Sequence, residues 1–364
     1  MKGRAAVFYG AGKPMVIKEY PLPDPEPGAI LIKVSLANVC GSDLHIWRGE
    51  VPWRMLPTIF GHEMTGRVFR LGPGVKTDSN GQPLAEGDRV VYQYFFFCGH
   101  CYACLSGNRA ACPNKYTEWT SHTCEEPPHF VGAYGEYYYL RPNHFVFKVP
   151  DELTDDMVAP LNCALSEVMY GLHQVGVSFG DTVAIQGAGG LGVYACAVAK
   201  DMGAGQVIVL DRFEDRLKLA RAFGADHTIN VSQVTDPRER AQQVRQLTGG
   251  RGADVVAELV GFPQVIPEGI SMLRVGGSYL LIGNISRGLT VEIDPSQLVS
   301  FSRRMVGVVT YEPWALSRSL EFLQRNKGKY PFDKILSHKF PLEQVNEAFQ
   351  QSDQGKVTRA ALVP

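Results

Sequence analysis

The chain has 364 residues, of which 45% are hydrophobic and 20% are charged, and these values suit a globular protein of about two domains. Its formal net charge of −1 gives no electrostatic reason to expect nucleic acid or a membrane surface as a partner. No apolar run is long enough to span a bilayer, and the N-terminus lacks the apolar core of a signal peptide, so we expect a cytoplasmic protein.

Short strand-like runs, with glycine and proline between them, dominate the first part of the chain. They fall at residues 5–9, 15–18, 29–34, 66–71 and 88–91. Alternate prolines over residues 21–27 predict an extended connector. Residues 77–86 are polar and turn-rich, which predicts a surface loop, and residues 116–130 have no clear period, which predicts an irregular segment. The first domain is therefore expected to be rich in β-structure.

The pattern changes near residue 155, where apolar residues at helical spacing predict a helix over residues 156–175 that links the two domains. Short apolar runs then alternate with amphipathic segments, which is typical of a parallel sheet buried on both faces. These runs fall at residues 182–185, 206–210, 253–258 and 279–282. We also expect a late strand at 305–309 and, after residue 341, a short helix followed by a strand at 359–363.

A glycine-rich segment lies between the first of these runs and the helical segment that follows it. It fits G-x-G-x-x-G, and its candidate cofactor-binding residues are Gly187, Gly189, Gly190, Leu191 and Gly192. A lone match to this motif is weak, but a strand before it and a helix after it are the context that a dinucleotide site requires. The glycines permit a tight turn, close approach of a pyrophosphate and close packing of helix on strand. The alternative is a structural turn that binds nothing.

Asp211 ends the second strand of this half, about 20 residues after the glycines, where a dinucleotide-binding chain carries an acid. Its carboxylate can accept hydrogen bonds from an adenosine ribose and would repel a 2′-phosphate. We therefore expect NAD rather than NADP, although the adjacent Arg212 could attract that phosphate.

Four of the eight cysteines are clustered with short spacers, and they are Cys98, Cys101, Cys104 and Cys112. Four thiolates satisfy a closed, tetrahedral structural zinc site. Iron–sulfur ligation is the alternative for this spacing, and disulfides are less expected in a chain without a secretory signal.

Cys196 lies on the helix after the glycines and is interpreted as a small buried residue. Cys124 is also left outside the cluster.

Cys40 and His62 are suitable zinc ligands, and Asp43 could orient a ligating imidazole. Each also has an ordinary interpretation, as a core cysteine or a hydrogen-bonded histidine. Sequence distance alone does not pair them.

Several short segments occur in a fixed order along nearly the whole chain. They are Cys40-Gly41-Ser42-Asp43-Leu44-His45, Gly61-His62-Glu63, Gly87-Asp88-Arg89-Val90, the four-cysteine segment, Gly132-Ala133-Tyr134-Gly135-Glu136-Tyr137, the glycine-rich segment and Asp211. In this order the sequence resembles the zinc-dependent medium-chain alcohol dehydrogenase family. The resemblance implies an α/β fold that combines a GroES-like β-rich catalytic domain with a Rossmann domain, a doubly wound parallel sheet. It implies a catalytic domain at residues 1–165 and 313–364, with a structural zinc lobe near 98–112, and an NAD-binding domain at 166–312.

The resemblance also implies a catalytic zinc bound by Cys40, His62 and Cys163, with Glu63 as the family's acid beside the metal. Three protein ligands leave one coordination position for water or a substrate oxygen. Two zinc ions per chain are therefore expected, one catalytic and one structural.

Other roles follow from the same resemblance. Ser42 would hydrogen-bond the substrate oxygen and pass its proton towards His45 and solvent, a task that suits a side chain whose pKa lies near neutrality. Arg216 and Arg359 would contact the adenosine ribose and pyrophosphate of the cofactor. Both arginines could equally be ordinary surface residues.

The leading interpretation is thus an NAD-linked alcohol dehydrogenase that acts on a small-molecule alcohol or ketone, with a homodimer or homotetramer expected from the resemblance. Aromatic residues beside the motifs, namely Trp47, Trp53, Tyr94 and Phe95, favour a medium-sized apolar alcohol, secondary or cyclic. The alternatives are a polyol or amino-alcohol dehydrogenase of the same family and a non-catalytic dinucleotide-binding protein. Glu167 departs from the small hydroxyl residue that relatives often carry near the nicotinamide, and the segments 77–86 and 116–130 look longer than in short relatives.

Overall fold

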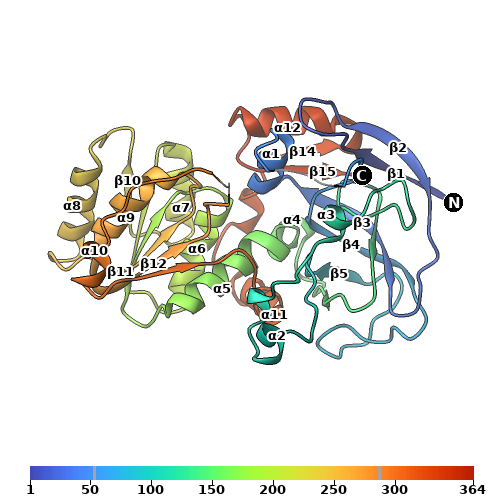
Figure 1. Cartoon of the computed structure of the whole chain (residues 1–364), viewed down its shortest axis with the longest axis horizontal. Coiled ribbons are helices and arrows are strands. Elements are labelled where there is room, and N and C mark those ends of the chain that lie inside the picture. Colours follow the sequence, from blue (N-terminus) through green and yellow to red (C-terminus); the bar gives the residue numbers. More distant parts are fainter. Residues whose placement is uncertain (52–54, 286–287) are drawn as a thin grey trace. The chain divides into compact units, whose positions relative to one another are not determined.

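We describe the protein from a computed structural model that covers residues 1–51, 55–285 and 288–364 (Figure 1). Trp53, one of the expected pocket aromatics, lies outside these residues. Contacts within the chain define two units, the first formed by Met1–Ser166 with Glu312–Pro364 and the second by Glu167–Tyr311. No helix in the described part of the chain has the length and apolar character of a membrane span.

The strands of the first unit come from both ends of the chain. They are β1 (Lys2–Val7), β2 (Val16–Pro21), β3 (Ile30–Asn38), β4 (Glu63–Leu71), β5 (Arg89–Tyr92), β6 (Tyr137–Leu140), β7 (Val146–Lys148), β14 (His338–Pro341) and β15 (Ala360–Val363). Seven of them form one sheet of order β14-β15-β3-β4-β5-β7, in which β6 also pairs with β3, while β1 and β2 form an antiparallel pair of their own. Because the C-terminal β15 pairs with β3, the tail of the chain completes the sheet that the N-terminal residues begin.

Short helices surround this sheet. They are α1 (Gly41–Trp47), α2 (Tyr102–Leu105), α3 (Glu118–Ser121), α4 (Asp155–Val158), α11 (Pro313–Asn326) and α12 (Val345–Asp353), with single helical turns at Arg109–Ala111, Phe332–Lys334 and Leu342–Gln344. The core of this unit is mainly aliphatic and includes a cluster of aromatic rings. The Phe60 ring lies 4.9 Å from Phe8, 5.3 Å from Tyr134 and 5.6 Å from Phe349, measured between centroids, so α12 packs on residues from the first half of the chain. These edge-to-face contacts are the arrangement that aromatic quadrupoles favour.

The second unit is a six-stranded parallel sheet of order β10-β9-β8-β11-β12-β13. Its elements are α5 (Ser166–Val175), β8 (Thr182–Gln186), α6 (Gly190–Asp201), β9 (Gln206–Asp211), α7 (Glu214–Ala222), β10 (His227–Asn230), α8 (Pro237–Leu247), β11 (Ala253–Glu258), α9 (Ile266–Met272), β12 (Leu273–Leu281), α10 (Ser296–Val299) and β13 (Arg304–Gly307), with a turn at Pro263–Val265. The first three strands run from β8 outward to β10, and the chain then crosses back so that β11 pairs with the opposite edge of β8. Such a reversal leaves a crevice beyond the carboxyl ends of the strands, where open α/β sheets bind ligands.

The expected combination of a β-rich domain and a doubly wound parallel sheet is confirmed. The expected helix over residues 156–175 is wrong in its first half, because α4 ends at Val158 and Pro160 precedes a π-helical turn, Leu161–Leu165. Proline has no N–H for the helical ladder and clashes with the preceding turn, which ends α4 at this point. Within residues 116–130 the structure contains the single-turn α3, where we expected no regular element.

Candidate functional site

The first candidate site brings together four residues from separate parts of the first unit. Cys40 precedes α1, His62 and Glu63 lie at the start of β4, and Cys163 lies in the π-helical turn. One ligand atom from each lies within 4.8 Å of all the others, and all four residues are buried. The two sulfurs are 4.0 Å apart, close to the roughly 3.8 Å expected for two thiolates bound to one tetrahedral zinc at about 2.3 Å. The donor set therefore fits a zinc ion.

Asp43 orients the imidazole of His62. Its Oδ1 lies 3.3 Å from His62 Nδ1, and this leaves Nε2 as the ring nitrogen available to a metal. Its Oδ2 accepts hydrogen bonds from the Cys40 amide at 2.9 Å and from the Tyr134 hydroxyl at 2.6 Å. Asp43 is fully buried, so these donors fix the carboxylate and the carboxylate in turn fixes the ring.

Three residues that we did not assign from the sequence support the same histidine. The Tyr92 hydroxyl and the Asn162 side-chain amide donate to the His62 carbonyl at 3.1 and 2.7 Å. Tyr134 anchors Asp43, as described above. Signals were present for two of them, because Tyr134 belongs to the motif at 132–137 and Asn162 is adjacent to Cys163. Tyr92 lies in an ordinary strand sequence that carries no such signal.

Glu63 forms a buried ion pair with Arg359 across the sheet, which joins the start of β4 to the residue before β15. Burial raises the pKa of the Glu63 carboxyl to about 8, while the Arg359 guanidinium opposes that rise. The structure thus holds Arg359, an expected cofactor contact, against an acid of the candidate metal centre.

Hydrogen bonding with Cys163 and His62 holds the pKa of the Cys40 thiol well below its ordinary value, which favours the thiolate form that binds metal.

Ser42 and His45 lie on α1, three residues apart and so on one helix face. Both are half-buried, and His45 Nδ1 pairs with the Glu50 carboxylate. Their expected roles concern proton transfer.

The expected pocket aromatics have different surroundings. The Tyr94 ring lies 4.6 Å from the His62 ring, which places it beside the metal cluster. Phe95 is buried, and Trp47 packs 6.0 Å from Phe349 of the core. Glu167, the departure noted in the sequence, is buried at the start of α5. Tyr94 is thus the expected aromatic residue that contacts the candidate centre.

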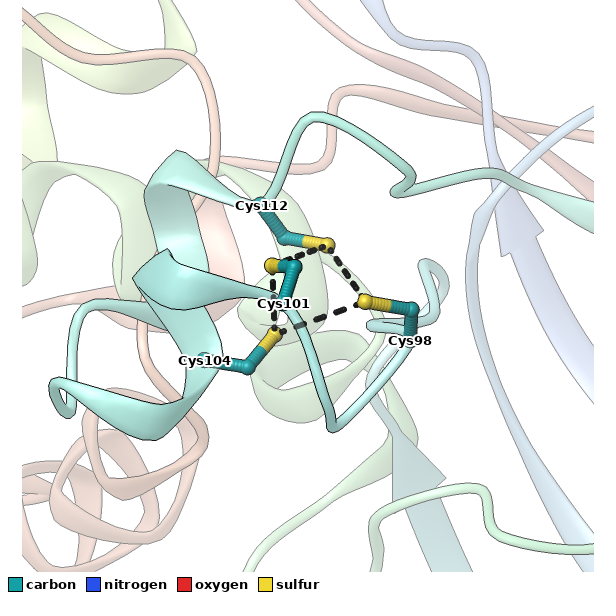
Figure 2. A group of neighbouring side chains, drawn as sticks. All are labelled: Cys98, Cys101, Cys104 and Cys112. Carbon is teal, nitrogen blue, oxygen red and sulfur yellow. Dashed lines mark hydrogen bonds between the residues drawn. The ribbon is translucent and has the colours of Figure 1, made fainter.

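The four clustered cysteines form the second candidate site (Figure 2). Their side chains point toward one another from the loop and turns around α2, and the dashed contacts join the sulfurs in a ring. The sulfur–sulfur distances around that ring are 4.0, 3.5, 3.8 and 3.6 Å, for the pairs Cys98–Cys104, Cys104–Cys101, Cys101–Cys112 and Cys112–Cys98. These values match tetrahedral zinc at about 2.3 Å from each sulfur and are far longer than a disulfide bond of about 2.05 Å. The four donors surround the space completely and leave no side of it for a substrate.

Neighbouring groups support this lobe, residues 98–112. The Asn114 side chain donates to Cys98 Sγ at 3.5 Å, and this contact, with nearby backbone amides, lowers the pKa of the thiol to about 5. Glu312, which is buried at the start of α11, accepts the Ala110 amide at 2.8 Å and lies 3.8 Å from Arg109. The lobe is therefore attached to the helix that follows the return of the chain to the first unit.

The third candidate site lies in the second unit, at the glycine-rich segment. Gly187 has a φ of 99°, a conformation that favours glycine, and a Cβ on Gly192 would lie 2.0 Å from the Gly187 carbonyl. Gly189 caps α6, and Gly190 and Leu191 begin it, so the unpaired amides of the first turn follow directly on β8. Such a helix N-terminus is suited to a pyrophosphate.

A cavity of about 390 Å³ extends from these glycines along the ends of the strands. Asp211 lines it and is 8% exposed. Its two oxygens accept the amides of Ala188 at 2.7 Å and Phe213 at 2.9 Å. Arg212 and Arg216 also line the cavity, and each guanidinium lies over the Phe213 ring, at 4.5 and 4.8 Å from its centroid. An acid and two arginines thus surround the place expected for the ribose.

An ion pair that the sequence did not suggest lines the same cavity. Arg240 of α8 donates to both carboxylate oxygens of Glu268 of α9, at 2.6 and 3.0 Å. Val231 and Val265 provide apolar walls beside it. With the pyrophosphate expected at the glycines and the ribose expected at Asp211, this end of the cavity is the part left for a base.

Comparison with known proteins agrees with this geometry. The family model described as an alcohol dehydrogenase GroES-like domain matches residues 26–151, and the model described as a zinc-binding dehydrogenase matches residues 190–325. The chain is 32% identical over 348 residues to 5-exo-hydroxycamphor dehydrogenase of Pseudomonas putida, which covers 94% of each protein. It is 32% identical over 360 residues to L-threonine 3-dehydrogenase of Thermococcus kodakarensis, which covers 95% of this chain and 93% of the relative.

A solved structure is similar over the same length. The crystal structure of an alcohol dehydrogenase from Thermotoga maritima matches with a TM-score of 0.94 and 33% identity, covering 100% of both chains. The expected GroES-like and Rossmann combination is confirmed by these matches together.

Proposed function

The chain belongs to the zinc-binding medium-chain alcohol dehydrogenase family, and from that premise we propose that it transfers a hydride between a medium-sized apolar alcohol, secondary or cyclic, and NAD. As a member of this family it is an oxidoreductase that acts on CH–OH groups. The observation that carries the proposal is the buried cluster of Cys40, His62, Glu63 and Cys163 beside the Tyr94 ring. One relative is named for a hydroxylated camphor, an apolar cyclic alcohol, which favours the same substrate class.

Cys40, His62 and Cys163 would hold one zinc ion, and the four cysteines of the lobe would hold a second. At the first centre a zinc ion would supply Lewis acidity that lowers the pKa of an alcohol hydroxyl. Asp43 holds the His62 ring in the orientation for binding, and the hydrogen bonds to the His62 carbonyl restrain the backbone beneath it. The lobe, with four thiolates and no open position, serves structure alone.

Ser42 would hydrogen-bond the substrate oxygen and His45 would take up the released proton. The Glu50 carboxylate lies beside His45 Nδ1 and would orient the imidazole for this transfer. Tyr94, against the His62 ring, would present an apolar surface to the substrate carbon skeleton.

NAD would accept the hydride at its nicotinamide ring. In the second unit the glycine segment would bind the pyrophosphate, Asp211 the ribose hydroxyls, and Arg216 the adenosine side of the cavity. Arg359 was the other expected cofactor contact, and its ion pair with Glu63 gives it a second task in the catalytic unit. A homodimer or homotetramer remains part of the proposal on the basis of family resemblance.

An amino-alcohol dehydrogenase is the second candidate, because relatives named for L-threonine reach 32% identity over nearly the whole chain. The experiment that separates the candidates is turnover of the zinc-loaded chain with each alcohol of a panel, followed by absorbance of the reduced nicotinamide. The panel contains primary, secondary, cyclic, polyol and amino-alcohol members, each with NAD and with NADP. A higher kcat/KM for cyclic or secondary apolar alcohols with NAD supports the proposal, and a higher value for L-threonine or polyols overturns the substrate assignment. Turnover of no member would favour a non-catalytic dinucleotide-binding protein.

A further inference from the structure

Three arginines of the second unit line a cavity that is separate from the cavity of about 390 Å³ at the glycine-rich segment, which we call the dinucleotide cavity. The cavity has a volume of about 280 Å³, and its charged lining residues are Arg238 and Arg245 of α8 and Arg303 before β13. Gln242, Ser271 and Gln297 add neutral polar groups. Among the residues that the structure describes, no acidic side chain lines it, and none of its lining residues lines the dinucleotide cavity.

Arg303 is the most constrained of the three. It is 8% exposed, and its guanidinium donates to the carbonyls of Leu273, Arg274 and Gln297, while the Phe301 ring lies 4.6 Å from it. Carbonyl oxygens orient a guanidinium but carry no net charge, so the positive charge stays uncompensated. Burial, with a contribution from the nearby Arg245, lowers the pKa of Arg303, as expected for a desolvated cation beside another cation.

Arg245 is held in the same way, because its Nη2 donates to the Ser271 carbonyl at 2.8 Å. Two buried acids on the adjoining elements are already engaged. Glu268 is paired through both oxygens with Arg240, and Asp254 is paired with Arg251 and Arg274. Within residues 1–51, 55–285 and 288–364, no carboxylate lies within ion-pair distance of Arg238, Arg245 or Arg303, the three arginines of the cavity.

We propose that this arginine cavity is a binding site for an anion of the phosphate class. Guanidinium forks match the geometry of phosphate oxygens, and three positive charges without a counter-charge favour a dianion over a single carboxylate. The amides of Gln242 and Gln297 and the Ser271 hydroxyl can donate or accept around such a group. The cavity is larger than a bare phosphate requires, so the anion can be inorganic phosphate or the phosphate group of a small metabolite.

The dinucleotide cavity could bind the same anions, and the two cavities share α8 and α9, so the test must separate them. We would titrate the full-length protein with inorganic phosphate by calorimetry, holding ionic strength constant with chloride. Arg238→Gln and Arg245→Gln remove one charge each from the arginine cavity. Arg216→Gln removes a charge from the dinucleotide cavity, and Arg318→Gln removes an exposed arginine that lies in the first unit. Arg303 is left unchanged because its carbonyl contacts also support the fold.

Phosphate should bind the wild-type protein, and Arg245→Gln should weaken it roughly tenfold or more, as expected for a charge-assisted contact. Arg238→Gln should weaken it as well. Arg245→Gln also removes the contact with the Ser271 carbonyl, so its loss of affinity has two sources. Arg238→Gln tests the site without that complication, because the Arg238 side chain is exposed. Arg216→Gln and Arg318→Gln should leave the affinity unchanged.

Absence of binding at constant ionic strength, or equal affinity in the two cavity variants and wild type, would overturn the proposal. So would a loss of affinity confined to Arg216→Gln, because the anion would then occupy the dinucleotide cavity. A parallel titration with glycerol 3-phosphate separates the two sources. Tighter binding than inorganic phosphate, lost in the same cavity variants, supports a phosphorylated metabolite, and equal or weaker binding supports free phosphate at the same site.

Discussion

The Glu63 carboxylate and the Arg359 guanidinium form a buried ion pair although 296 residues separate them in the chain. Glu63 is the first residue of β4 and follows the candidate metal ligand His62, and Arg359 directly precedes β15. The pair therefore fastens the C-terminal strand to the candidate metal centre. Removing one partner of a buried pair leaves the other group with neither water nor a hydrogen-bond partner, and this is the main source of the cost.

Arg359→Met should lower the free energy of unfolding by about 1–3 kcal/mol, because the buried Glu63 carboxyl, whose pKa is already raised to about 8, loses its hydrogen-bond partner and carries a proton at neutral pH. Arg359→Met combined with Glu63→Gln should be less destabilised than the single variant. Urea denaturation of wild type, both single variants and the double variant, followed by circular dichroism, measures the difference. If the double variant were as unstable as the sum of the two single variants, the pair would contribute no coupling, and the anchoring role would be wrong.

Cys112→Ser should remove one of the two zinc ions that we propose for each chain and lower stability, because Cys112 supplies one of four buried or half-buried thiolates. Native mass spectrometry counts the metal ions directly. Cys196→Ala is the matched control, since Cys196 lies on α6 and its thiol contacts the Gly192 carbonyl rather than the lobe. A zinc content that is the same in the Cys112 variant and the control would argue against the structural site.

Asp43→Asn should weaken zinc binding at the catalytic centre by about 10–100-fold, because a neutral amide holds the His62 ring less firmly and makes it less basic. Competition of the purified variant with a chelator measures that affinity. Asp236→Asn is a suitable control, because Asp236 caps α8 and asparagine is an equally good cap. An unchanged affinity in Asp43→Asn would show that the contact at 3.3 Å does not orient the ligand.

Much of the fold was predictable because its signals are local. Buried apolar runs separated by amphipathic segments identify a parallel sheet, and the strand, glycine turn and helix at residues 182–201 identify the place of its ligand crevice. The four cysteines of the lobe are also close in sequence, so their spacing alone suggested a metal.

The support around the candidate catalytic centre was less accessible, since its partners are distant in the chain. Tyr134 meets Asp43 across 91 residues, and Asn162 meets His62 across 100. Hydrophobic periodicity carries no information about such pairs, because only the folded sheet brings them together. Hydrophobic periodicity also gave a wrong prediction near Cys163, because apolar residues continue there at helical spacing. Pro160 interrupts the helix, and Cys163 lies in the π-helical turn that follows.

Asp211→Asn should lower kcat/KM with NAD by about 10–100-fold, the loss expected for a charged hydrogen bond of 1.5–3 kcal/mol. With NADP the loss should be smaller, because repulsion of the 2′-phosphate disappears together with the charge. Initial rates with both cofactors give the ratio. Asp215→Asn on α7 is the control, since its side chain is 94% exposed. An equal loss with both cofactors would assign Asp211 to the support of the Ala188 and Phe213 amides alone.

His144 is held neutral by its surroundings. Its Nδ1 lies 2.8 Å from the Arg141 carbonyl, so the proton on Nδ1 is donated there, and its ring lies 3.9 Å from the Phe96 ring. Nε2 is buried with no hydrogen-bond partner in the described part of the chain. A second proton on Nε2 would have no acceptor, and burial accordingly lowers the pKa of His144 from 6.5 to about 3.

Because the pKa of His144 is lower in the folded chain than in the unfolded chain, its contribution to stability is fully present above pH 6.5 and is lost as the pH falls towards 3. At pH 4.5 the unfolded chain binds a proton that the folded chain does not, which should lower the free energy of unfolding by about 2–3 kcal/mol. His144→Asn keeps a donor for the Arg141 carbonyl but cannot be protonated. It should be less stable than wild type at pH 7, because the ring contacts are lost, and its free energy of unfolding should fall by about 2–3 kcal/mol less between pH 7 and pH 4.5. Urea midpoints at the two pH values give this difference, and loss of zinc in acid affects both proteins alike. Parallel losses in the two proteins would mean that His144 accepts a proton in the folded chain after all.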